Sequence, residues 1–314
     1  MSGTPQQAKI AVAGASGTIG RAVVGALLGD GREVIALMRE GSTRPRELGR
    51  AQVETTPLAD AEGLAELLQQ QGARTVISCI ASRSGSLKDA QAVDYQANID
   101  LLRAAEGAGV EHFILLSAIC VQRPKLAFQH AKLAFEAELV ASPIAHTIVR
   151  PTAFFKSLSG QVDRVRNGKP FFLFGDGELT ACKPISDADL ARFIVAQVDD
   201  DRALGAILPI GGPGPAITLK RQGELLFEAA GRDPEFRHVP ISLFNAAAGL
   251  FSLGTWASEW FANKAEYARI ARYYATESML LLDPETGEYS AEATPEFGSD
   301  TLADHYARLL HETG

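Results

Sequence analysis

Near the N-terminus, a short apolar run leads into three regularly spaced glycines, and this feature constrains the fold more than any other. Residues Ile10–Ala13 are all apolar, glycines stand at positions 14, 17 and 20, and apolar residues then recur at helical spacing up to Leu28. The pattern predicts a buried strand, a tight turn and a helix, the arrangement of a dinucleotide-binding loop. The N-terminus of such a helix attracts a pyrophosphate. We expect the cofactor to contact Gly14, Ser16, Gly17, Thr18, Ile19 and Gly20.

Strands and helices alternate through the first half of the chain, which predicts an α/β fold with a doubly wound parallel sheet of the NAD(P)-binding Rossmann type. Ligands of such sheets bind outside the carboxyl ends of the strands. The predicted strands are Ile10–Ala13, Val34–Met38, Val53–Thr55, Thr75–Ile80, Phe113–Ser117 and His146–Val149. The predicted helices are Thr18–Leu28, Ala61–Gln71, Asp94–Ala108 and Phe128–Leu139.

The composition of the sequence changes after Pro151, where phenylalanines and glycines become frequent. We expect residues 1–155 to form the NADP-binding domain and residues 156–314 to form a smaller, mostly C-terminal substrate lobe. Residues 184–213 are expected to return to the first domain, because Ala206–Ile210 has the character of another strand.

The composition is that of a globular protein. The net charge of −8 and the absence of a cluster of basic residues in the sequence argue against nucleic-acid binding. Three widely spaced cysteines predict reduced thiols, and nothing at the N-terminus resembles a signal peptide, so we expect a cytoplasmic location. The uncharged stretch Val239–Ser258 is interrupted by polar residues, proline and glycine, which argues against a membrane span. Contact with a membrane surface through Ile241–Trp260 stays open as an alternative. We expect no protein-bound metal.

Arginines at the end of the second predicted strand favour NADPH over NADH. NAD-binding domains commonly place an acidic residue there, whereas a guanidinium binds the 2′-phosphate of NADP. Here Arg39 stands at that position and Arg44 and Arg46 follow closely, with Glu40 as the competing residue and solvated surface arginines as the alternative interpretation. The remaining cofactor contacts are expected at the carboxyl ends of later strands and on the helix after the fifth. They are Ile80, Ala81, Ser82, Ser117, Lys132 and Pro151.

The segment from Ser117 to Lys132 is laid out like the active segment of short-chain dehydrogenases, with one departure. That family uses a serine followed by Tyr-x-x-x-Lys, and here Phe128 stands where the tyrosine should be. A phenyl ring cannot donate or accept a proton, so the departure points away from carbinol chemistry and toward an atypical member. Lys132 could still bond the nicotinamide ribose.

Motifs along nearly the whole chain resemble those of the NADPH-dependent divinyl chlorophyllide a 8-vinyl reductases, an atypical family of short-chain dehydrogenases/reductases. They are Leu115–Gln122, Val149–Leu158, Phe174–Gly177, Cys182–Ser186, Leu208–Pro213, Gln222–Phe227, Arg272–Met279 and Asp283–Pro295. The resemblance implies reduction of the C8 vinyl group of divinyl chlorophyllide or protochlorophyllide to ethyl, in chlorophyll or bacteriochlorophyll synthesis. It also implies a magnesium tetrapyrrole as the substrate. No alkoxide forms in this reaction, which accounts for Phe128.

The resemblance leaves the proton donor and the pigment contacts to be assigned. Lys132 is the first candidate donor, although it could hold the ribose without transferring a proton; Tyr95 and His130 follow. A broad apolar disc with a propionate needs aromatic walls and a few placed polar groups, although each aromatic could equally be an ordinary core residue. Lys156 and Lys183 are the candidate partners for the propionate, with solvated surface lysines as the alternative. The expected substrate contacts are Phe154, Phe155, Lys156, Phe174, Phe251 and Trp256.

Three other functions fit the same cofactor loop. One is an atypical reductase or epimerase of another small substrate, such as a phenylpropanoid or a sugar. Another is an NADP-sensing regulator without turnover. The third is an assembly subunit with a structural nucleotide.

Overall fold

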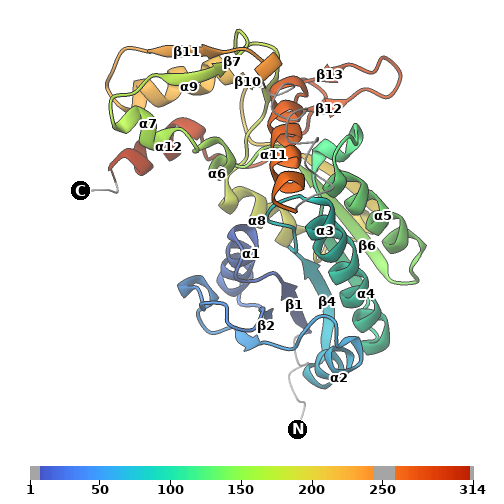
Figure 1. The fold of residues 1–314 in the computed structure, drawn as a ribbon. Coiled ribbons are helices and arrows are strands. Elements are labelled where there is room, and N and C mark those ends of the chain that lie inside the picture. Colours follow the sequence, from blue (N-terminus) through green and yellow to red (C-terminus); the bar gives the residue numbers. More distant parts are fainter. Residues whose placement is uncertain (1–7, 244–258, 312–314) are drawn as a thin grey trace.

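The computed structural model describes residues 8–243 and 259–311 and is built around a seven-stranded parallel sheet (Figure 1). The strand order is β3-β2-β1-β4-β5-β6-β9. Successive strands are therefore added toward one edge from β1 to β3 and toward the other edge from β4 onward, so the strand order reverses between β1 and β4. The fold is therefore the Rossmann-type α/β sheet that the sequence predicts. A reversal of this kind creates a crevice at the carboxyl ends of the strands, where ligands of such sheets bind. The strands are β1 (Lys9–Ala13), β2 (Val34–Leu37), β3 (Gln52–Glu54), β4 (Ala73–Ser78), β5 (His112–Leu116), β6 (Ala145–Pro151) and β9 (Ala206–Ile210).

Helices cover both faces of the sheet and form two separate cores. On one face, α1 packs against α8, and their apolar residues join the inward side chains of β1 and β2. On the other face, α2 and α4 pack together, with α5 beside α4. The helical segments of this part are α1 (Thr18–Gly29), η1 (Arg46–Leu48), α2 (Ala61–Gln71), α3 (Leu87–Asp89), η2 (Ala90–Gln96), α4 (Ala97–Ala108), η3 (Ile119–Gln122), α5 (Ala127–Ala141), α8 (Asp187–Ala196) and η4 (Asp201–Ala203).

The remaining elements form a second, smaller layer beside the carboxyl ends of the strands (Figure 1). Strand β7 pairs in parallel with β11, and a third core gathers Phe171, Phe227 and Tyr306. The chain returns to the main sheet in between, because α8 packs on α1 and β9 pairs with β6. The elements of this layer are α6 (Phe155–Leu158), α7 (Val162–Arg166), β7 (Phe171–Phe174), β8 (Ala181–Cys182), β10 (Ile217–Thr218), α9 (Leu219–Ala229), β11 (Phe236–Val239), α11 (Glu259–Thr276), β12 (Leu281–Leu282), β13 (Tyr289–Ser290) and α12 (Leu302–His311).

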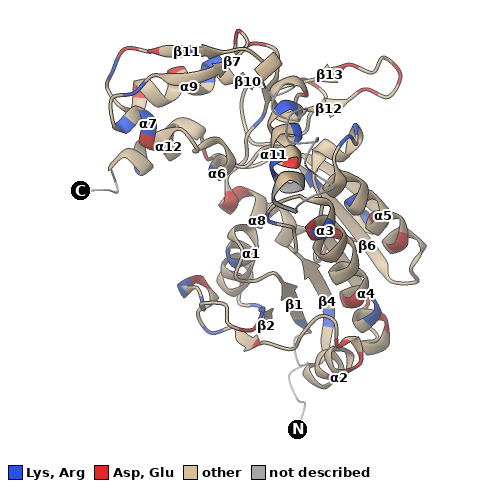
Figure 2. Ribbon diagram, viewed as in Figure 1, with Lys and Arg blue, Asp and Glu red and all other residues tan. Residues whose placement is uncertain are grey.

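Charge lies mainly on the outer helices, while the central strands are mostly uncharged (Figure 2). This distribution is expected for a parallel sheet covered on both faces. In the part of the chain that the structure describes, none of the helices has the length and apolar character needed to cross a membrane.

The helix predicted from Asp94 begins earlier and less regularly than its apolar pattern indicates. The Ser86 side chain caps α3 by accepting a hydrogen bond from the Asp89 backbone, and the π-helical segment η2 follows before the regular helix α4. A π-helical segment shifts the positions of side chains along a helix, and such segments are frequent at functional sites. Here it contains Tyr95, a candidate proton donor, and Asp94, which pairs with Lys132.

Candidate cofactor and substrate site

The glycine loop between β1 and α1 is shaped to admit a phosphate. Gly14 has a φ of +76°, and a Cβ there would lie 2.8 Å from the Cys79 carbonyl oxygen. A Cβ on Gly20 would lie 2.2 Å from the Gly14 carbonyl oxygen, so α1 can approach the loop only because position 20 is glycine. Gly17 is the N-cap of α1, and no side chain caps the helix. The first N–H groups of α1 are therefore left for an anion, and the loop fits a dinucleotide.

The predicted loop residues contribute in different ways. Gly17 is exposed, and Ser16 and Thr18 are half-buried, so all three can face a ligand. Ile19 is only 7% exposed and packs in the core beneath the sheet, so its side chain is unavailable to a cofactor. Its possible contribution is limited to the backbone.

Lys156 was expected beside the substrate, but its side chain extends to the glycine loop. Its Nζ donates a hydrogen bond to the Thr18 hydroxyl oxygen at 2.7 Å, on an exposed surface. The charges of Lys156 and Arg21 also act on Asp187, whose pKa is raised because burial outweighs these cations and His305. A cation at the first turn of α1 stands where a pyrophosphate would bind. The structure therefore favours a cofactor contact for Lys156 over the substrate contact that the sequence predicts.

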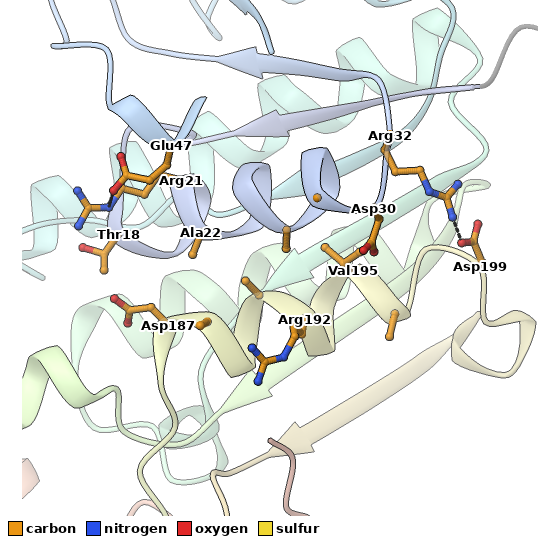
Figure 3. A pocket seen from close by; sticks show the side chains of 15 residues that line it. Thr18, Arg21, Ala22, Asp30, Arg32, Glu47, Asp187, Arg192, Val195 and Asp199 are labelled. Atoms are coloured by element: carbon orange, nitrogen blue, oxygen red, sulfur yellow. Dashed lines mark hydrogen bonds and ion pairs between the residues drawn. The ribbon is translucent and has the colours of Figure 1, made fainter. Parts of the chain in front are cut away.

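A cavity of about 820 Å³ runs along the outer groove between α1 and α8 (Figure 3). Small residues such as Ala22 line its floor, and ion pairs such as Arg32–Asp199 and Arg21–Glu47 lie along its sides. Only its end near Thr18 reaches the cofactor loop. The groove is thus a consequence of small residues at a helix contact, away from the carboxyl ends of the central strands.

The two arginines after β2 differ in their partners. Arg39 is exposed. Burial would raise the pKa of the Asp89 carboxyl, but hydrogen bonds from Ser84 and Arg83 and the charge of Arg39 hold that pKa below its ordinary value. Arg44 donates from one nitrogen to the backbone carbonyl oxygens of Gly49, at 2.8 Å, and Ala51, at 3.4 Å.

The engagement of Arg44 was not predicted, because backbone carbonyls leave no charge pattern in a sequence. Arg44 holds its own loop closed, and Arg39 is the guanidinium that faces outward at the end of the strand. Arg39 is therefore the better placed of the two for a 2′-phosphate.

A buried ion pair joins the loop after β4 to α5. The Lys132 Nζ lies 3.1 Å from Asp94 Oδ1, and the two side chains are 10% and 1% exposed. The same Asp94 oxygen accepts a hydrogen bond of 3.3 Å from the Ser82 backbone N–H. Of the predicted cofactor contacts in this loop, Ile80 is buried, Ala81 is exposed and Ser82 is half-buried. Lys132 therefore lies beside the loop at the ligand-binding edge of the sheet, where a nicotinamide ribose is expected.

Other predicted residues turn away from this edge. Tyr95 directs its hydroxyl to Glu138 Oε1 at 3.4 Å, on an exposed part of α5, because η2 packs along that helix. The Ser117 hydroxyl donates to Glu136, which also pairs with Arg150. Tyr95 is thus poorly placed as a proton donor, and the Ser117 side chain serves an internal network.

His130 and Phe128 of α5 lie in different surroundings, one exposed and the other packed against a neighbouring helix. His130 is exposed on the helix surface, as the alternative interpretation of the sequence has it. The Phe128 ring packs with Ile270 of α11, and a Cβ on Gly85 would lie 3.4 Å from it and 3.1 Å from Ile270. Position 128 is thus a packing contact between the two parts of the molecule.

A second cavity, of about 450 Å³, opens at the carboxyl ends of β5 and β6 and is walled on the other side by α11 and the second layer. Its size and mostly apolar lining are those of a small-molecule pocket. Phe154 and Phe174, two of the expected substrate contacts, line it, as does Pro151, which was expected to contact the cofactor. Phe155 is 2% exposed and packs in the core of the second layer. Phe251 and Trp256 lie outside the described residues.

Sequence reasoning missed several groups in this cavity. Cys120, Tyr274 and Glu277 line it, with Gln222 at another wall. No lysine or arginine is among the described residues that line it; Lys183 instead pairs with Glu296. The signal for Tyr274 was present in the motif Arg272–Met279, which the sequence analysis singled out without assigning it a role. Within residues 8–243 and 259–311, no three His, Cys, Asp or Glu side chains gather as a metal site.

Comparison with known proteins identifies the family. The NAD(P)H-binding family model matches residues 14–201, more than half of the chain. A rice protein named divinyl chlorophyllide a 8-vinyl-reductase, chloroplastic, is 47% identical over 98% of this chain and 80% of its own length. The Arabidopsis thaliana protein of the same name is 45% identical over 98% of this chain and 78% of its own. The chain belongs to the divinyl chlorophyllide a 8-vinyl-reductase family.

As a member of the 8-vinyl-reductase family, the protein is an NAD(P)H-dependent oxidoreductase. Solved structures of more distant proteins share its fold. Leucoanthocyanidin reductase from Vitis vinifera, solved with NADPH, has a TM-score of 0.71 at 18% identity and covers 96% of this chain and 99% of its own. The quinone oxidoreductase QOR2 of Escherichia coli, also solved with NADPH, has a TM-score of 0.69 at 19% identity, with 96% and 100% covered.

Proposed function

We propose that this 8-vinyl reductase reduces the C8 vinyl group of a divinyl chlorophyllide or protochlorophyllide to ethyl, with NADPH as the reductant. One observation carries the proposal. A mostly apolar cavity lies at the carboxyl ends of β5 and β6, its wall includes Cys120, a neighbour of Lys132, and Phe128 replaces the tyrosine that carbonyl reduction would need. The family relationship supports the same reaction.

The cofactor is held by residues of the first part of the chain. The glycine loop and Lys156 bind the pyrophosphate, Arg39 binds the 2′-phosphate, and Lys132 bonds the nicotinamide ribose. Bound NADPH supplies a hydride to an alkene that is conjugated with the macrocycle. The protein's own contribution is to hold the reacting groups in contact and to exclude water from them.

The pigment enters the cavity by its vinyl-bearing edge. Phe154 and Phe174 supply aromatic contact, and Pro151 and Ala153 border the edge of the sheet. Because no cation is among the described lining residues, the propionate points out of the cavity, toward the mouth or solvent. Phe251 and Trp256 stay predicted substrate contacts.

The decisive experiment is anaerobic incubation of the purified protein with NADPH and divinyl chlorophyllide a, or divinyl protochlorophyllide a. We expect a blue shift of the Soret band and an ethyl product two mass units heavier. Cofactor binding without turnover would instead favour a sensing regulator or an assembly subunit. Turnover of a phenylpropanoid or a sugar, and not of the pigment, would favour another reductase. Cytoplasmic location and membrane contact stay predictions, tested by cell fractionation and by liposome binding.

A further inference from the structure

The motif Arg272–Met279 places a tyrosine hydroxyl in the substrate cavity. Tyr274 is on the last turn of α11 and lines the cavity, and 47% of its surface is accessible, so a bound molecule can reach it. Its phenol lies close enough to the thiol of Cys120, which follows β5 and is only 5% exposed, for each group to affect the pKa of the other. Both residues line the cavity, and Ala118 and Ile119 from the end of β5 line the same wall.

The neighbouring tyrosine has a different role. The Tyr273 hydroxyl donates to the backbone carbonyl oxygens of Cys120, at 2.9 Å, and Arg123, at 3.2 Å. It is 3% exposed, and its ring meets that of Tyr274 edge to face. Tyr273 thus anchors α11 to η3, and this anchor positions Tyr274 over the cavity.

Cys120, which lines the cavity together with Tyr274, is also a neighbour of Lys132. Burial raises the pKa of the Cys120 thiol, and Gln129, the charge of Lys132 and Tyr274 only partly oppose that rise. One chain of neighbours therefore runs from the ribose-binding lysine through Cys120 to Tyr274.

Reduction of a vinyl group needs a proton as well as a hydride, and the candidates named from the sequence are poorly placed to supply it. Tyr95 bonds to Glu138, His130 is exposed on the outside of α5, and Lys132 is committed to Asp94. We propose that Tyr274 is the proton donor of this reductase. The inference rests on the proposed function.

The terminal vinyl carbon accepts the hydride with its electron pair, the vinyl π bond breaks, and the displaced pair spreads over the conjugated macrocycle. The inner vinyl carbon then forms a C–H bond with the proton of the Tyr274 hydroxyl, whose O–H bond breaks. The tyrosinate regains a proton from water at the accessible side of the cavity. NADPH supplies both electrons, so no further oxidant or reductant is needed.

The surroundings keep the hydroxyl protonated until it is used. Burial raises the pKa of Tyr274 well above its ordinary value, and the neighbouring Cys120 and Tyr273 raise it further. Glu277 lines the same cavity, and its carboxylate pairs with Lys125 and Arg123. A neutral phenol at all physiological pH values is the form that a general acid requires.

Tyr274→Phe tests the assignment in the full-length protein, with divinyl chlorophyllide a and NADPH. General acid catalysis contributes about 100-fold or more, so we expect kcat to fall by at least about 100-fold while the Kd for NADPH stays unchanged. The residual rate should rise as pH falls, because solvent must then supply the proton, whereas the wild-type rate should be level between pH 6 and 9. Tyr267→Phe is the matched control, because Tyr267 lies on the same helix and is 51% exposed; it should match wild type.

Two results would overturn the assignment of Tyr274 alone: a Tyr274→Phe enzyme with wild-type kcat, or an unchanged pH profile in a slowed one. Cys120→Ala provides a second reading if Tyr274→Phe does not fold. Loss of one neutral hydrogen bond should lower kcat by no more than about tenfold, and a 100-fold loss would identify the thiol as the donor instead. If the wild type itself makes no ethyl product, the proposed function and this inference both fail, which separates that outcome from failure of Tyr274.

Discussion

The Lys132 ammonium and the Asp94 carboxylate form an ion pair of 3.1 Å that is almost wholly buried, between α5 and the segment η2. The second Asp94 oxygen, Oδ2, is buried without a hydrogen-bond partner in the described structure. Removing either charge would leave the other unpaired in the interior, at a cost of about 3–5 kcal/mol. The pair is therefore a structural support as well as a candidate ribose contact.

A double-mutant cycle separates these two roles of Lys132. Lys132→Met should lower the free energy of unfolding by about 3 kcal/mol, and adding Asp94→Asn should recover most of that loss, because no unpaired charge remains. Turnover should stay low in both variants, since neither offers a cation to the ribose. Chemical denaturation and NADPH-dependent reduction are the two measurements. Recovery of activity in the stable double variant would remove Lys132 from the site.

The glycine loop offers a matched pair of substitutions on one helix. Gly20→Ala would bring a Cβ to 2.2 Å from the Gly14 carbonyl oxygen, while Gly25→Ala meets nothing within 4 Å. We expect Gly20→Ala to abolish measurable cofactor binding and to destabilise the fold by about 1–3 kcal/mol. Gly25→Ala should keep cofactor affinity and gain up to about 1 kcal/mol from helix propensity. Calorimetry and cofactor titration test both, and normal affinity in Gly20→Ala would contradict the role of the loop.

The proposed preference for NADPH is assigned to Arg39, which makes it testable by substitution. A charged hydrogen-bonding contact contributes about 1.5–3 kcal/mol, so Arg39→Ala should weaken NADPH by about 10- to 100-fold and change NADH affinity by less than about threefold. Arg103→Ala on α4 is the control for net charge, because Arg103 is exposed on a helix that covers one face of the sheet. Equal losses of NADPH and NADH affinity would show that Arg39 does not bind the 2′-phosphate.

Short-range sequence patterns predicted the helices, strands and turns whose structure depends on residues close to one another in the chain. The strand–glycine–helix unit is recognisable because Gly14 and Gly20 each meet a backbone atom of a neighbour, which no other residue tolerates. Helix α2 has the predicted bounds, since Asp60 caps its start and Gly72 ends it in the left-handed conformation. The strand at Ala206–Ile210 is β9, which returns to the main sheet as expected and lies at its edge.

Contacts between distant segments were beyond such patterns. Lys156 and Thr18 are 138 residues apart, and a lysine next to phenylalanines suggested a substrate contact instead. The buried partner of Lys132 depends on the π-helical segment η2, which has no signal in apolar spacing. Tyr274 lay in a recognised motif, but only the packing of α11 against η3 reveals that its hydroxyl reaches Cys120.

Glu277 links three segments around the substrate cavity and should make their docking sensitive to acid. Burial alone would raise the pKa of its carboxyl, but hydrogen bonds from Lys125 and Tyr289 and the charge of Arg123 hold it below the ordinary value of 4.5. Because the folded-state pKa is lowered, this stabilisation is fully present above about pH 4.5 and is lost as pH falls through the lowered value.

Glu277→Gln tests this dependence. The variant should be less stable than wild type by about 1–3 kcal/mol at pH 7, and the difference should shrink toward pH 3. Glu285→Gln, at an exposed position on the β12–β13 turn, should show no such difference at either pH. Urea denaturation across the pH range measures it, and a difference independent of pH would refute the electrostatic origin.

Lys156 distinguishes a cofactor contact from a substrate contact. Its hydrogen bond to Thr18 places the ammonium at the first turn of α1, so Lys156→Ala should weaken NADPH and NADH alike, by about tenfold, since both carry the pyrophosphate. The KM for the pigment, measured at saturating NADPH, should stay within about twofold. Lys169→Ala, at an exposed position in the turn between α7 and β7, is the control for net charge. A raised pigment KM with unchanged cofactor affinity would instead restore Lys156 to the propionate, and the cation at the glycine loop would then have only a structural role.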